Sequence, residues 1–334
     1  MKRLLVVIVV FALGYSAYWA VGARGARAGF ETWFDARRAE GWQADYTALD
    51  LKGFPNRFDT TLTRPVLADP ETGLSWQAPF LQIFALAYRP NHIIAVWPKQ
   101  QSFATPLARY DVTSDDLRAS LVMGADTSLP LERSNLVASS MEVVNTATDQ
   151  RVALGGVQVA LHRVETTVSE YRLAVNVDGF APPAPLKLHL DTGGALPDTL
   201  DALRADVTVG FDKPLDLSAI EQARPQPRRI RLRLAEARWG ALELQFAGTL
   251  EVDETGRPTG RITVKARNWR DIIALAEKAG WLPGTVADQF AQGLGMVAGL
   301  SGNPETLDLP LSFGGGLMSL GPIPIGRAPV LRLR

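Results

Sequence analysis

The residues best suited to chemistry in this sequence are three histidines, His92, His162 and His189. Histidine acts as a general base or a metal ligand when a second functional group stands at a suitable spacing, as in HExxH. Each histidine here is alone in its segment, and strand alternation predicts polar, outward-facing positions for His162 and His189. We therefore predict no catalytic residue, no metal site and no cofactor.

The sequence contains no cysteine, which excludes disulfides, thiol nucleophiles and an acylated N-terminal cysteine. Motifs of serine hydrolases, phosphate-binding loops, EF-hands and dinucleotide-binding folds are also absent from it. Carboxylates assembled from distant strands leave no linear motif. A cryptic carboxylate hydrolase is thus the remote alternative to a protein that is not an enzyme.

Residues 224–238 carry the clearest local charge bias, with six arginines. On a strand, Arg229, Arg231 and Arg233 share one face, where they could contact anionic lipid headgroups. The other interpretation is a solvated face that pairs with acidic residues of neighbouring strands, such as Glu251. Both interpretations place the arginines on the polar side of a sheet.

The stretch from Pro79 to Trp97 places apolar groups on both faces of two expected strands, so both faces need cover. One interpretation is a fully buried central hairpin. The other is that one face lines a hydrophobic groove for an acyl chain. The candidate apolar-ligand surface consists of Phe80, Ile83, Phe84, Leu86, Tyr88, Ile94, Val96 and Trp97.

The elements that must position these residues begin with an apolar N-terminus. From Leu4 to Ala23 there is no charge, and a helix of about 20 residues spans the roughly 30 Å of hydrocarbon in a bilayer. We expect residues 1–23 to form a transmembrane anchor, or else a cleaved signal peptide ending near Ala23. Residues 24–41 are expected to form a juxtamembrane helix.

The flanks of this apolar segment predict its orientation. The basic pair Lys2 and Arg3 favours an N-terminus in the cytoplasm, and the aromatic residues Tyr15, Tyr18 and Trp19 suit the opposite membrane interface. We therefore expect a single-pass protein of the inner membrane with its body in the periplasm.

The composition of the whole chain fits a folded body. It has 334 residues, 46% of them hydrophobic and 21% charged, which is enough to bury one large core or two ordinary ones. Basic and acidic residues balance at 35 each, so no global field would attract nucleic acid. The membrane, a lipid or another envelope protein are the partners that remain.

From Trp42 onwards the dominant pattern is a period of two, which is typical of strands with one buried face. It predicts a mainly β, β-dominated α+β fold of antiparallel curved sheets or meanders. The proline-rich residues 181–185 suggest a junction between an N-terminal half, 42–180, and a C-terminal half, 186–334.

Two segments illustrate how the pattern assigns elements. Alternation predicts strands around Leu186, Leu188 and Leu190, and around Ile230, Leu232 and Leu234. Short covering helices are expected at 269–279 and 285–298, the first capped by Asn268 and stopped by Gly280.

A short motif carries a family resemblance. Gly53-Phe54-Pro55-Asn56-Arg57-Phe58-Asp59 resembles a Gram-negative envelope family known as domain of unknown function 2125, and the likeness extends over most of the chain. The closing residues 313–326 also resemble AsmA-like envelope proteins, more loosely. That looser likeness implies a curved sheet whose apolar face handles lipid.

Physically, this motif is a demanding turn. Gly53 and Pro55 end a strand, Phe54 and Phe58 can pack inward, and Arg57 can pair with Asp59 or an adjacent carboxylate. The sequence as a whole predicts a membrane-tethered protein that binds or passes a lipid or other apolar ligand without catalysis. The alternative is an envelope scaffold that recognises another protein.

Overall fold

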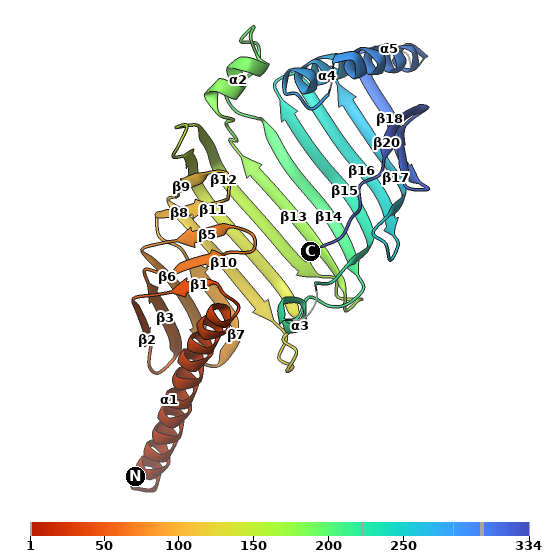
Figure 1. Ribbon diagram of the computed structural model, residues 1–334. Helices are drawn as coiled ribbons and strands as arrows, with labels where there is room; N and C mark the ends of the chain where they lie inside the picture. The colour runs from red at the N-terminus through yellow and green to blue at the C-terminus, as the bar shows by residue number, and fades with distance from the viewer. Residues whose placement is uncertain (1, 222–223, 283, 301–303, 334) are drawn as a thin grey trace. The chain divides into compact units, whose positions relative to one another are not determined.

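Antiparallel strands are the main element of the computed structural model, which describes residues 2–221, 224–282, 284–300 and 304–333. A long N-terminal helix and a few short helices accompany the strands. This arrangement confirms the predicted β-dominated α+β class (Figure 1).

The chain divides into two compact units. The first comprises Met1–Ala125 and Leu136–Asp149, and the second comprises Asp126–Asn135 and Gln150–Arg334. The proline-rich residues 181–185, at which the halves were expected to meet, lie inside the second unit.

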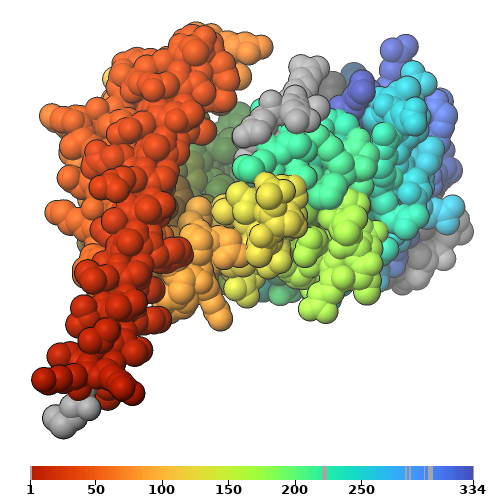
Figure 2. Space-filling view, turned by 90° about the horizontal axis from the view of Figure 1, so that it is seen from below, coloured from red at the N-terminus to blue at the C-terminus, as the bar shows by residue number. Residues whose placement is uncertain are grey.

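The helices in the described residues are α1 (Lys2–Ala39), α2 (Ala184–Leu190), α3 (Leu217–Glu221), α4 (Trp269–Lys278) and α5 (Gly284–Leu300). Helix α1 joins the two segments expected at 1–23 and 24–41 without a break. Its N-terminal side chains from Leu4 to Leu13 are exposed, and the helix protrudes from the strands of its unit (Figures 1 and 2).

The first unit contains two antiparallel arrays, in the orders β2-β3-β6-β7-β10 and β1-β4-β5-β8-β9-β11. Its strands are β1 (Gln43–Asp45), β2 (Ala48–Lys52), β3 (Arg57–Thr63), β4 (Val66–Asp69), β5 (Leu74–Gln77), β6 (Phe80–Leu86), β7 (Arg89–Val96), β8 (Gln100–Ala104), β9 (Arg109–Thr113) and β10 (Asp116–Met123). One of the boundaries between the units falls within β11 (Leu131–Asn145).

The core of the first unit forms where the C-terminal end of α1 meets both arrays. Phe34 of α1 packs with Ala44, Leu49 and Leu62, and partly buried neighbours such as Leu81 surround them. Burial of these apolar groups holds the end of α1 against the strands.

The second unit is a meander in which each strand from β12 to β20 pairs with the next. Its strands are β12 (Arg151–Arg163), β13 (Glu170–Asp178), β14 (Ala202–Phe211), β15 (Pro227–Trp239), β16 (Leu242–Val252), β17 (Pro258–Arg267), β18 (Thr306–Gly314), β19 (Leu317–Leu320) and β20 (Ile323–Arg327). Helices α4 and α5 pack on strands near its C-terminal end, around the buried Trp269 and Leu294.

Two local predictions in the second unit are wrong. Leu186, Leu188 and Leu190 lie on helix α2, because Pro185 in its first turn favours a helix start. Leu190 is buried, whereas Leu186 and Leu188 are exposed. Helix α4 begins directly after Asn268, as predicted, but Asn268 adopts a left-handed backbone and makes no capping hydrogen bond; its side-chain Nδ2 donates to the carbonyl of Ala241 at 2.8 Å instead.

A β-bulge corrects a third prediction, the alternation along β15. Strict alternation predicts that Leu234 follows Leu232 on the apolar face. The register with β16 shifts between Leu232 and Ala235, and Ala235 is the residue opposite Phe246. A bulge inserts one residue and changes which residues face the apolar side. Gly280, by contrast, follows α4 with a φ of +74°, as expected of a helix stop.

Candidate functional site

The residues of the predicted apolar-ligand surface lie on or next to the paired strands β6 and β7. Phe84 is opposite Ile94, and Ile83 is opposite Ala95. Because successive residues of a strand point to opposite faces, Phe80, Phe84, Ile94 and Val96 share one face while Ile83 lies on the other. Tyr88 lies in the turn after β6 and is 63% exposed.

These two faces differ in what covers them. On the face of Ile83, Leu81 packs against the core around Phe34. On the other face, the guanidinium carbon of Arg57 lies 5.6 Å from the centre of the Phe84 ring, and His92 contacts Ser120 at 3.1 Å. Polar groups therefore interrupt the apolar residues, and the structure does not bring the eight together on one surface.

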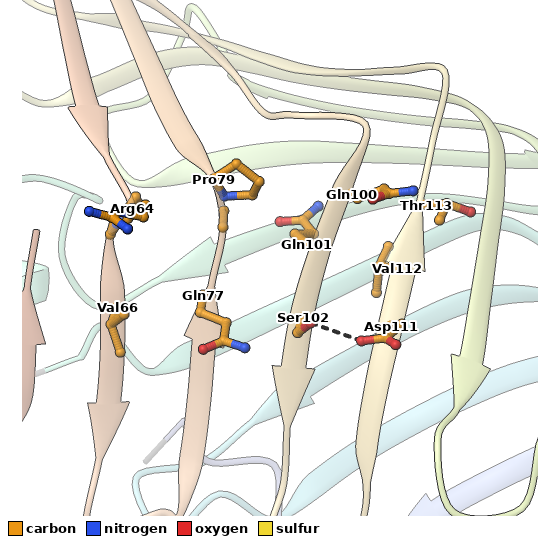
Figure 3. Close-up of a pocket in the computed structure, with 12 residues that line it drawn as sticks. Arg64, Val66, Gln77, Pro79, Gln100, Gln101, Ser102, Asp111, Val112 and Thr113 are labelled. Carbon is orange, nitrogen blue, oxygen red and sulfur yellow. Dashed lines mark hydrogen bonds between the residues drawn. The ribbon is translucent and has the colours of Figure 1, made fainter. Parts of the chain in front are cut away.

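A pocket of about 670 Å³ lies elsewhere in the first unit, across β4, β5, β8 and β9 (Figure 3). Its wall combines apolar groups with amide, hydroxyl and charged side chains, and Ser102 donates a hydrogen bond to Asp111 at 2.8 Å. The lining residues are Arg64, Pro65, Val66, Gln77, Ala78, Pro79, Gln100, Gln101, Ser102, Asp111, Val112 and Thr113. This mixture offers hydrogen-bonding groups as well as apolar contacts.

The predicted cationic strand is β15, and acidic residues of its neighbours pair with two of its three candidate arginines. Arg229 donates to Glu251 on β16 at 2.7 Å, and Arg233 donates to Asp206 on β14. Arg231 is exposed, opposite threonines on both adjacent strands. Lipid headgroups would therefore compete with existing ion pairs at this face.

Asp206 is the most strongly engaged of these acidic groups. It accepts hydrogen bonds from Arg172 at 2.9 and 2.6 Å as well as from Arg233. Hydrogen bonding by Arg172 holds the pKa of Asp206 below its ordinary value. The carboxylate thus fixes β13, β14 and β15 together on the polar side of the second unit.

The opposite side of the second unit is a continuous apolar surface that crosses the meander in register. One row of directly opposed residues is Leu161, Leu173, Val207, Leu232, Gly248, Ile262 and Leu311. The next row is Val159, Val175, Ala205, Ala235, Phe246, Val264 and Leu309. We call these two rows the apolar field.

The apolar field lies between two covered ends of the sheet. At one end, α4 and α5 pack over Leu244, Ala266 and Leu307, with Leu309 of the field buried beside them. At the other end, Tyr171 is 1% exposed and its hydroxyl accepts a hydrogen bond from the backbone of Leu215 at 3.0 Å. Between these covers, the residues of the two rows from β12 to β17 are only half-buried.

Sequence reasoning identified strands of this surface but did not propose it as a site. The alternation of β12, β13 and β14 was visible, yet the sequence alone does not say which residues of different strands are opposite each other. The signal that could have located the field is the number of consecutive strands with an apolar face, compared with the few helices available to cover them.

The three histidines lie apart from this surface. His92 and His162 are on strands, whereas His189 is on helix α2, not on the predicted strand. Its Nε2 lies 2.8 Å from the carbonyl oxygen of Lys278. Among the described residues no group of three or more potential ligands is placed to hold a metal ion.

The motif at residues 53–59 forms the turn between β2 and β3. Gly53 has a φ of +106°, and a Cβ there would lie 2.7 Å from the carbonyl oxygen of Arg57, so only glycine fits. Arg57 pairs with Asp59 and Phe58 is buried, as predicted. Phe54 is instead 57% exposed, and its ring contacts Trp19 of α1 edge-on.

Together these features define a class of β-dominated protein with one described helix long and apolar enough to span a membrane. Residues 19–329 match the model of a family described as uncharacterised protein conserved in bacteria (DUF2125), and the chain belongs to this family. No curated protein and no solved structure matches the chain. The resemblance carried by residues 53–59 is thus confirmed, while the looser likeness to AsmA-like proteins stays a prediction.

Proposed function

We propose that this protein is a single-pass inner-membrane protein whose body lies in the periplasm and binds or passes a lipid or another apolar ligand, without catalysis. The apolar field of the second unit is the observation that carries this proposal. Acyl chains bind to mostly apolar surfaces, and the field offers two in-register rows of half-buried aliphatic side chains with Phe246 among them.

The N-terminal helix supports the membrane tether. Its apolar side chains from Leu4 to Leu13 are exposed, which is costly in water and favourable in hydrocarbon. The basic pair before them favours a cytoplasmic N-terminus, and the body then lies in the periplasm. A tethered body would meet lipid at high local concentration.

The test must report locally, because a membrane-spanning helix carries lipid into any detergent extract. Photoreactive benzoylphenylalanine is placed at Val175, in the apolar field, or at Asn176, its neighbour on the polar face. Full-length protein is irradiated in intact cells, purified and analysed by mass spectrometry. We expect phospholipid adducts at position 175 and few or none at position 176.

The matched pair makes the result decisive. Equal lipid labelling at both positions would show that the probe reports only proximity to the membrane, and no lipid at position 175 would contradict the proposed function. If position 175 instead crosslinks reproducibly to one polypeptide, the apolar field is a protein interface and the scaffold alternative replaces lipid binding.

A further inference from the structure

Two turns of the first unit hold α1 at one level along its length. The Tyr18 hydroxyl donates to the carbonyl of Ala87, in the β6–β7 turn, at 2.6 Å. The Trp19 indole Nε1 donates to the carbonyl of Arg57, after the β2–β3 turn, at 2.8 Å. Since α1 thereby meets both turns at successive residues, their positions along the helix are fixed.

Close packing reinforces this contact one turn further along α1. The Trp19 and Phe58 rings are 6.0 Å apart, and a Cβ at Gly22 would lie 2.6 Å from the Phe58 ring. Glycine at this position thus allows α1 to approach the strand closely. The helix is docked on the unit from Tyr18 onwards.

Tyr18, where α1 first contacts the turns, lies within the length of helix that is needed to cross a bilayer. From Leu4 to Tyr18 an α-helix rises only about 21 Å, whereas the hydrocarbon core is about 30 Å thick. A bilayer whose hydrocarbon core begins near Leu4 therefore reaches the level of the two turns. Tilting of the helix would place the turns deeper still.

The turns carry the side chains that a membrane interface accepts. Phe54 in the β2–β3 turn is 57% exposed and Tyr88 in the β6–β7 turn is 63% exposed. Tyrosine is enriched at membrane interfaces, and phenylalanine suits the boundary between headgroups and acyl chains. The exposed cations Lys52 and Arg89 stand beside the two turns, where anionic headgroups would attract them.

We propose that residues 53–56 and 87–88 form a membrane-contact edge, which inserts Phe54 and Tyr88 into the interface of the same bilayer that α1 spans, in the leaflet away from the N-terminus. This inference rests on the proposed tether. It assigns the family motif at residues 53–59 a role: the motif presents Phe54 to lipid and Phe58 to the helix. The first unit is then held directly on the membrane surface.

Single cysteines test the edge, because the natural chain has none. Full-length Phe54→Cys and Tyr88→Cys are labelled with an environment-sensitive fluorophore and reconstituted into vesicles of phosphatidylethanolamine and phosphatidylglycerol. Val9→Cys on α1 is the reference within the span. Leu107→Cys, at a turn of the same unit where the native side chain is 97% exposed, is the matched reference in water.

We expect labels at positions 54 and 88 to shift to shorter emission wavelengths and to lose most of their emission to lipids carrying a spin label near the headgroup. The label at position 9 should be quenched best by a spin label near the acyl-chain end, and the label at position 107 by neither. If position 9 is quenched while positions 54 and 88 behave like 107, the edge is wrong and the tether stands. If position 9 is not quenched, both proposals fail.

Discussion

The two units cover their apolar strand faces in different ways. In the first unit, the end of α1 places Phe34 among strands of both arrays. In the second, α4 and α5 place Trp269 and Leu294 over one end of a long meander, and the rows beyond remain half-buried. A long sheet with few helices therefore leaves most of two in-register apolar rows without a helix over them.

The difference shows what an alternating sequence does and does not specify. Alternation makes one face apolar in every strand, but cover depends on how many helices lie over that face. The comparison predicts large losses of stability in the two helix-covered cores, around Trp269 and around Phe34, and smaller losses in the apolar field. Each variant is made in the full chain in mild detergent and followed by hydrogen exchange, which reports stability locally.

Trp269→Ala should give the largest effect. Trp269 is 2% exposed, and its indole nitrogen donates to the carbonyl of Pro304 at 3.0 Å. Removing a buried tryptophan costs about 4 kcal/mol, so exchange in β16, β17 and β18 should accelerate strongly. Trp281→Ala, where the side chain is 79% exposed, is the control; equal effects of the two variants would refute the role of Trp269 as the centre of this cover.

Phe34→Ala tests the cover in the first unit. The ring is 2% exposed and contacts Tyr46 edge-on with centres 4.8 Å apart, so its loss should cost about 3 kcal/mol. Exchange should rise in β2 and β3 and leave the second unit unchanged. The neighbouring Trp33→Ala, where the side chain is 42% exposed, should have a much smaller effect, and acceleration spread over both units would contradict separate cores.

Asp206→Asn tests the polar side of the second unit. Asp206 is 16% exposed while its partners Arg172 and Arg233 are 36% and 68% exposed, so we expect a loss of only about 1–2 kcal/mol at neutral pH. Because folding lowers the pKa of Asp206, its contribution is complete above the unfolded value of 3.8 and is lost as the pH falls through the lower folded value.

The pH dependence gives this prediction a second measurement. The difference in unfolding free energy between the natural protein and Asp206→Asn should be constant near neutral pH and should narrow as the pH falls below about 4. Other carboxyl groups with lowered pKa values, such as Asp253, titrate in both proteins and cancel. A difference that widens in acid would mean that the ion pairs do not stabilise the fold.

Much of the fold follows from sequence because strand alternation and helix stops are local signals. The paired charges of Arg229 with Glu251 and the positive φ of Gly280 were both predictable from neighbouring residues. The bulge in β15 was not, since Leu234 continues the even-numbered pattern and only pairing with β14 and β16 reveals the shift.

The candidate surfaces were harder to predict because they depend on distant residues. The sequence predicted a ligand surface at Phe80 to Trp97 because apolar residues are frequent there. Their frequency does not reveal that the two faces of β6 and β7 contact different neighbours. Likewise, Phe54 was expected inside because it is large and apolar. Its exposure becomes meaningful only when Trp19 of α1 is seen beside it.

Leu232→Ala should give the smallest effect and is the direct test of the apolar field. Leu232 is half-buried between Val207 and Gly248, so its truncation should cost about 1 kcal/mol of stability. The comparison variant is Leu309→Ala. The Leu309 side chain is 8% exposed beneath the helices, so its truncation should cost about 3 kcal/mol. Hydrogen exchange in β14–β16 and β17–β18 measures the two losses. If both variants lose the same stability, the part of the field on β12–β17 is as well covered as its helix-bound end and has no free surface for a ligand.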